Sequence, residues 1–104
     1  MLIYNITYHV ESSQERNFYI WLHEVLIPEV EKSEFNLKNP RICRILSHRG
    51  DEEGESYTLQ WEVDNSAELH RWHLAQGKHF DEELQKIFKD HVVVITTLME
   101  VIPY

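Results

Sequence analysis

Six polar residues could form a chemically active cluster if a β-sheet brings them together. They are His9, Arg44, His48, Gln60, Glu62 and Glu100. A histidine and a carboxylate enclosed in one cleft can exchange protons with a ligand near neutral pH. The strand order argued below places Arg44 near Glu62, on a sheet face that no helix covers. The competing interpretation is that these groups pair across a subunit interface or stay in water, as charged side chains usually do.

Seven histidines are many for a chain of 104 residues, so metal binding has to be considered. His70 and His73 stand three residues apart on an expected helix and share one face. No carboxylate or thiol at ligand spacing completes a set with them, and His79 lies beyond Gly77. We therefore expect a helical face in water here, and neither a metal ion nor another cofactor.

Cys43 is the only cysteine, which excludes an internal disulfide and a zinc site built mainly from thiolates. It falls in mid-strand beside Ile42 and Ile45. A cysteine in such a place usually acts as a small buried hydrophobe, so we expect Cys43 to be buried and inert.

The charge balance excludes several classes of partner. Ten Lys and Arg against 18 Asp and Glu give a net charge of -8, and binding to a nucleic-acid backbone needs a basic face. No apolar run approaches the length that spans a membrane, and the first residues lack the pattern of a secretory signal. We expect a cytoplasmic protein with no nucleic-acid and no membrane partner.

Hydrophobic periodicity predicts four strands. Residues 2–10 alternate between an apolar and a more polar side, and residues 56–63 repeat this alternation. A second strand begins near Arg41, after a loop at 36–40 and before a hairpin connection at 50–55. The final strand, residues 91–102, is apolar on both of its sides.

Two helices are expected between these strands. The first opens at a capping box formed by Ser12 and Glu15 and carries a wide apolar stripe. The second opens at Asn65, with Glu68 as its capping partner. It is interrupted near Gly77 and resumes to about residue 89.

The order β-α-β-β-α-β predicts one α+β domain of the ferredoxin-like type over residues 1–104, with both helices on one face of an antiparallel sheet. Strands one and three should be central. Their sides away from the helices carry small uncharged polar groups, whereas the final strand adds apolar ones. Because a sheet face in water would be charged, we expect a second copy of the chain to cover it. The result is a homodimer of the dimeric α+β barrel type.

The sequence also resembles a small bacterial family of unknown function. The resemblance rests on residues 2–10, 21–22, the Ile-Pro-Glu-Val string at 27–30, and residues 41–46, 57–61 and 97–101. It implies a cytoplasmic protein with a ferredoxin-like fold of the dimeric α+β barrel type, and it brings no reaction with it. The chain departs from the family pattern at Leu26, where related sequences tend to have a histidine, so no role of that histidine carries over.

Two functions remain open. The absence of a recognisable catalytic motif favours a non-catalytic homodimer that binds a small molecule or a protein partner. The alternative is a small dimeric-barrel enzyme, a cofactor-free oxygenase or isomerase, that uses a polar cleft between the sheet and the helices.

Overall fold

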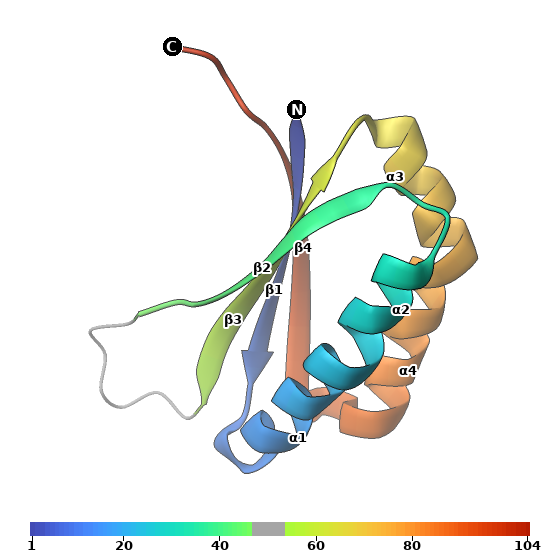
Figure 1. The fold of residues 1–104 in the computed structure, drawn as a ribbon. Helices are drawn as coiled ribbons and strands as arrows, with labels where there is room; N and C mark the ends of the chain where they lie inside the picture. Colours follow the sequence, from blue (N-terminus) through green and yellow to red (C-terminus); the bar gives the residue numbers. More distant parts are fainter. Residues whose placement is uncertain (47–53) are drawn as a thin grey trace.

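The chain folds into one antiparallel sheet with all helices packed on one side of it (Figure 1). A computed structural model describes residues 1–46 and 54–104. Its strands are β1 (Leu2–Val10), β2 (Leu37–Arg44), β3 (Glu55–Val63) and β4 (Val92–Glu100). They pair in the order β2-β3-β1-β4. The predicted α+β ferredoxin-like arrangement, with the first and third strands central, is confirmed.

Two helical regions cover the sheet, and each contains a π-helical segment. The first comprises α1 (Glu15–Trp21), the π-helical η2 (Leu22–Leu26) and α2 (Ile27–Lys32). The second comprises α3 (Ser66–Trp72), the π-helical η3 (His73–Gly77) and α4 (Lys78–Phe88). Short 3-10 turns, η1 (Ser12–Gln14) and η4 (Lys89–His91), precede the first region and follow the second.

The hydrophobic core lies between the sheet and these helices. On β1 the buried residues Ile6, Tyr8 and Val10 alternate with less buried ones, as the sequence pattern predicted. Burial on β3 alternates in the same way, with Leu59, Trp61 and Val63 buried. Phe18 of α1 is completely buried, with its ring centroid 4.9 Å from that of Tyr8. Burying one such side chain stabilises the fold by about 1.5–3 kcal/mol.

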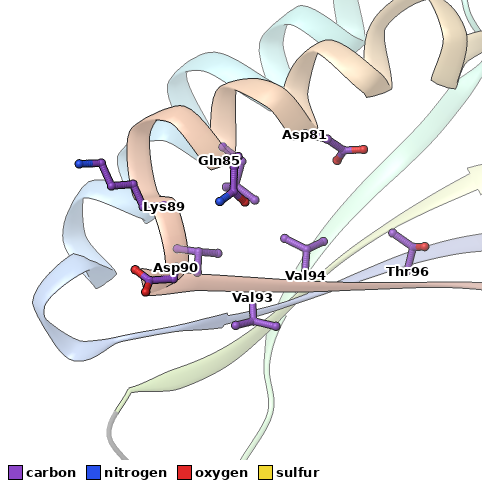
Figure 2. A pocket seen from close by; sticks show the side chains of 9 residues that line it. Asp81, Gln85, Lys89, Asp90, Val93, Val94 and Thr96 are labelled. Carbon is purple, nitrogen blue, oxygen red and sulfur yellow. The ribbon is translucent and has the colours of Figure 1, made fainter.

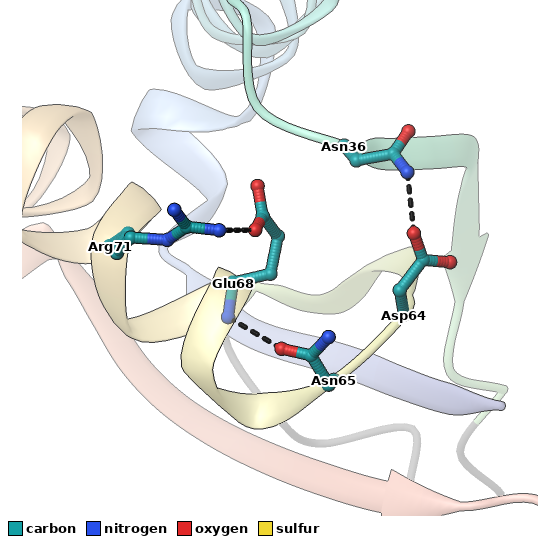
Figure 3. A network of polar contacts seen from close by, with 5 residues as sticks. All are labelled: Asn36, Asp64, Asn65, Glu68 and Arg71. Atoms are coloured by element: carbon teal, nitrogen blue, oxygen red, sulfur yellow. Dashed lines mark hydrogen bonds and ion pairs between the residues drawn. The ribbon is translucent and has the colours of Figure 1, made fainter.

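Side-chain caps fix the entry to the second helical region (Figure 3). The Asn65 Oδ1 atom accepts a hydrogen bond of 2.8 Å from the Glu68 backbone N–H, so the predicted cap is confirmed. The Glu68 carboxylate pairs with Arg71 instead of turning back to close the box. Just before the cap, Asp64 accepts a hydrogen bond from Asn36, which ties the end of β3 to the start of β2.

The cap predicted for the first helix is wrong. Ser12 lies in the 3-10 turn η1, and no side chain caps α1. The Glu15 carboxylate instead accepts a hydrogen bond of 3.0 Å from the Tyr57 hydroxyl. A contact between distant segments has therefore replaced the local one that the sequence offered.

The second strand differs from its prediction in length and in burial. Residues 37–40, expected in a loop, already belong to β2, and the register shifts between Lys38 and Arg41. Asn39 takes a positive φ of 52° at this irregularity, and Pro40 is tolerated because β2 is an edge strand. Cys43, expected to be buried, is exposed opposite Thr58 on the face that carries no helix. The hairpin connection expected at 50–55 falls largely outside the described residues.

The interruption expected near Gly77 takes the form of the π-helical turn η3. Gly77 keeps a helical φ of -60°, so the helix passes through it. A Cβ atom there would lie 2.7 Å from Trp72 Cζ3, a distance well inside van der Waals contact. Gly77 therefore leaves space for the Trp72 ring against the helix backbone.

We expect the substitution Gly77→Ala to destabilise the protein. Alanine gains about 1 kcal/mol over glycine in a helix, but overpacking a filled core costs about 1–3 kcal/mol. Thermal unfolding should show a midpoint several degrees lower, at about 4–8 °C per kcal/mol for a domain near this size. Lys78→Ala, at the exposed neighbouring position, should change the midpoint little. A higher midpoint for Gly77→Ala would contradict this account of the turn.

Candidate functional site

The six polar residues singled out in the sequence do not form one cluster. His9 lies opposite Ser56 at one end of the sheet, with its Nδ1 atom 3.0 Å from the Ser56 hydroxyl oxygen. Gln60 lies in the middle of the sheet, and Glu62 lies toward the other end. These three do share the face without helices, which we call the open face.

Arg44 and Glu100 occupy the opposite face. Arg44 pairs with Tyr57 and places its guanidinium carbon 5.9 Å from the centre of that ring. Tyr57 and Glu62 are five residues apart on β3, which separates them by about 17 Å, so the expected proximity of Arg44 and Glu62 is wrong. Glu100 pairs with Leu2 on the helix side. His48 lies outside the described residues, and ligand binding by any of the six stays a prediction.

A hydrogen-bonded polar network occupies the centre of the open face. The Gln60 Nε2 atom donates to Asn5 Oδ1 at 3.1 Å, and Asn5 Nδ2 donates to Thr7 Oγ1 at 3.1 Å. Asn5 is only 9% exposed although no helix covers it. The expectation of a partly buried, hydrogen-bonded polar surface is confirmed for these residues.

A groove lies on the other face, between β4 and the second helical region. A volume of about 350 Å³ is lined by Tyr4, Ser66, Leu69, His70, His73, Asp81, Thr96 and Leu98. A second volume of about 520 Å³ shares Asp81 and Thr96 with it and extends along α4 to Asp90. We call the two together the β4 groove. Figure 2 shows Asp81 on the side of α4 nearest β4, and Thr96 and Val94 directed from β4 toward the helix.

The π-helical turn η3 places His73 in this groove. The Nδ1 atom of His73 lies 3.1 Å from the position that a Cβ atom on Gly77 would take. The Trp72 ring fills the space beside it and meets the Tyr4 ring edge-on, with the centroids 6.0 Å apart. Gly77 and Trp72 thus position His73 and Tyr4, and π-helical turns of this kind are frequent at functional sites.

Three ionisable groups in the groove influence one another. Partial burial raises the pKa of Asp81, nearby His73 lowers it in part, and Glu82 raises it further. Burial also raises the pKa of Tyr4, the Asp81 charge adds to that rise, and a hydrogen bond with Thr96 opposes it. A carboxyl group that is driven toward its neutral form beside a histidine can act as a proton donor or acceptor.

A second, shallower cleft lies at the opposite edge of the sheet. It encloses about 560 Å³ between α1 and the β2-β3 edge and is lined by Glu15, Arg16, Tyr19, Ile20, Arg44 and Tyr57. Burial raises the pKa of Tyr57, and the hydrogen bond to Glu15 adds to the rise. Arg44 is therefore near a cleft, but not the one expected from the sequence.

Metal binding finds no support in the described geometry. Within residues 1–46 and 54–104, no three His, Cys, Asp or Glu side chains gather closely enough to hold an ion. His79 instead forms an ion pair of 3.1 Å with Glu83 on its own helix.

Over residues 1–46 and 54–104, no helix is both long enough and apolar enough to cross a membrane.

The spacing of polar residues in the sequence indicated the β4 groove, although the residue types alone did not. His73 and Asp81 are eight residues apart on one helical region, about two turns, and Leu69 and Leu84 line the same groove. Thr96 interrupts the apolar run of the final strand on the helix side. Polar residues that interrupt an otherwise apolar stripe were the available indication. Of the two histidines expected on a helical face in water, His70 is exposed and His73 is partly exposed, and both line the groove.

Comparison with known families decides the classification of the chain. A family model described as a domain of unknown function (DUF4286) matches residues 1–102. The chain belongs to this family. The resemblance inferred from the sequence is thereby confirmed, and membership in DUF4286 assigns no reaction. A comparison with curated proteins finds no match.

Solved structures with the same fold include three bacterial proteins. An ethyl tert-butyl ether (EthD) family protein from Bacillus halodurans has a TM-score of 0.70 at 14% identity, covering 98% of this chain and 100% of that chain. A candidate antibiotic biosynthesis monooxygenase from Deinococcus radiodurans has a TM-score of 0.68 at 16% identity, covering 100% and 95%. A candidate monooxygenase of the same kind from Bacillus cereus has a TM-score of 0.60 at 14% identity, covering 100% and 94%. At such identities the likeness concerns the fold alone.

We expect Asp81→Asn to stabilise the protein at neutral pH. Because the folded state raises the pKa of Asp81, folding favours the protonated carboxyl, and stability falls as pH rises from the ordinary value near 3.8 through the folded value. The asparagine variant avoids that loss, so it should be more stable above this range and no more stable below it. Solvent reaches the carboxyl, so the gain should stay below about 1 kcal/mol.

Chemical unfolding of both proteins at pH 7 and pH 3 measures this difference. The difference in free energy of unfolding should shrink at pH 3. A variant that is less stable than the parent at pH 7 would show that the Asp81 charge is compensated within the fold.

Proposed function

We propose that residues 1–104 act as one domain of a homodimer that binds a small organic molecule in the β4 groove. The observation that carries the proposal is the groove itself, which is lined by Tyr4, His73 and Asp81 together with the apolar Leu69 and Leu98. Its volume falls in the range of small-molecule sites, about 300–1,000 Å³. A cytoplasmic location and the absence of nucleic-acid and membrane partners stay predictions, based on charge and composition.

The composition of the open face supports the dimer. Its β4 residues Val93 and Ile95 are 55% and 63% exposed, and Met99 is exposed beside them. Its central part contains the Asn5 network and hydroxyl side chains, and Arg41 of the edge strand β2 lies opposite Gln60. A contiguous face of this kind in water is unusual, and a second copy is the partner that a self-complementary sheet face most often takes.

The size of the open face is sufficient for such a contact. Strands spaced by about 4.8 Å with about 3.4 Å per residue give a projected area of about 600 Å² for four strands of about nine residues. The accessible surface of the side chains exceeds this projection. It approaches the value of about 800 Å² per partner that stable interfaces bury.

The dimer is tested by placing a charge on the open face. Ile95→Glu should shift the protein from dimer to monomer in analytical ultracentrifugation, because the carboxylate would have to be desolvated in the interface. Leu74→Glu is the matched control, since Leu74 is 64% exposed on the helical side and Ile95 is 63% exposed on the open face. A parent protein that sediments as a monomer at high concentration would refute the homodimer.

The ligand site is tested by a fragment screen observed in NMR spectra of the protein. We expect the fragments to shift the protein's backbone amide signals around Thr96 and His73. The substitution Thr96→Phe should abolish these shifts, because the larger side chain fills the groove. Ile20→Phe, in the second cleft, should leave them unchanged. Shifts that cluster elsewhere, or that survive Thr96→Phe, would remove the groove as the site.

An enzyme of the cofactor-free oxygenase or isomerase type is the second candidate. The raised pKa of Asp81 beside His73 favours it, and the fold is shared with proteins described as candidate monooxygenases. The same fragments distinguish the two functions. Recovery of each fragment unchanged after prolonged incubation in air supports binding alone. Conversion that Asp81→Asn abolishes while binding persists would favour the enzyme.

A further inference from the structure

We propose that the β4 groove selects ligands that carry a protonated amine, which the Asp81 carboxylate binds. This inference rests on the proposed function, because it names the chemical class of the ligand for the same groove. Two observations lead to it: the Asp81 carboxylate has no partner of its own, and the charges around the groove are mostly negative.

Asp81 forms no hydrogen bond or ion pair among the described residues, although the charge of nearby His73 lowers its pKa in part. The ion pairs found there join Lys38 to Asp64, Arg71 to Glu68, His79 to Glu83, and His91 to Glu11. None includes Asp81, which lines both volumes of the groove. Water reaches the Asp81 carboxylate, and a ligand amine that displaces this water gains a charge-assisted hydrogen bond.

No lysine of the groove provides a donor to Asp81, and His73, whose charge lowers the pKa of Asp81 in part, forms no hydrogen bond or ion pair with it. Lys89 lines the far end, beside Asp90, and Figure 2 shows its amine directed away from Asp81. Glu82 adds a further negative charge near Asp81. With the histidines counted as neutral, the whole chain has a charge of -8, so the long-range field also favours a cation.

The walls of the groove fit the rest of such a ligand. Leu69 and Leu98 line it near Tyr4, and Leu84 and Val94 line the part along α4. Tyr4 lines the same part of the groove, and the contact of its ring with Trp72 holds that ring in place. The arrangement suits a small primary amine with a flat or branched apolar body, and it disfavours carboxylates.

The proposal is tested with three probes of equal shape, benzylamine, benzyl alcohol and benzoate, titrated into the full chain at pH 7.5 and followed by NMR. Benzylamine should bind about tenfold more tightly than benzyl alcohol, since a charge-assisted hydrogen bond replaces a neutral one. Benzoate should bind more weakly than both. The shifts should centre on the amides of Asp81, Thr96 and His73.

Two variants separate a specific contact from a general field. Asp81→Asn should reduce the affinity for benzylamine about tenfold and leave benzyl alcohol unaffected. Glu82→Gln removes the same charge one residue away and should change the affinity for benzylamine by less than about twofold.

The outcomes distinguish a failure of the amine preference from a failure of the ligand site itself. Equal binding of the three probes in the groove, or tighter binding of benzoate, would overturn the amine preference and leave the ligand site standing. Retained amine selectivity in Asp81→Asn would do the same. Failure of all three probes to perturb the groove would overturn both the amine preference and the proposed site.

Discussion

The constraint on which this structure depends is that one sheet has two faces and the chain has helices for only one. The aromatic core around Phe18 and Trp61 seals the sheet against α1, α2 and α4. The helices therefore do not bury the apolar residues on the open face of β4, such as Ile95. A face of this composition needs another cover, and the proposed homodimer is the answer that requires no further component.

The β4 groove follows from how the helices cover the sheet near its β4 edge. The second helical region reaches β4 with a π-helical turn, and Gly77 in that turn gives the Trp72 ring its place. The Trp72 ring in turn contacts the Tyr4 ring. The absence of a side chain at Gly77 therefore positions both Trp72 and Tyr4. The same π-helical turn that interrupts the regular helix therefore also places His73 at the groove.

The Asp81 charge lowers the stability of the fold at the position where we propose that a ligand binds. Burial raises the pKa of Asp81 and nearby His73 offsets this rise only in part, so the Asp81 charge lowers the stability of the folded chain at neutral pH. Groups that a fold tolerates without benefit to stability are candidates for a functional role. The same reasoning gives less weight to Arg44, whose charge is already engaged with the Tyr57 ring.

The sequence by itself determined the element order, the central strands, the buried sides of β1 and β3, and the Asn65 cap, because all of these depend on periodicity and on contacts between near neighbours. It misplaced the start of β2 and the exposure of Cys43, since a bulge between Lys38 and Arg41 sets that register. Only the tertiary structure brought Tyr4, His73, Asp81 and Thr96 together, because they come from the four elements β1, η3, α4 and β4, whose distances depend on helix packing.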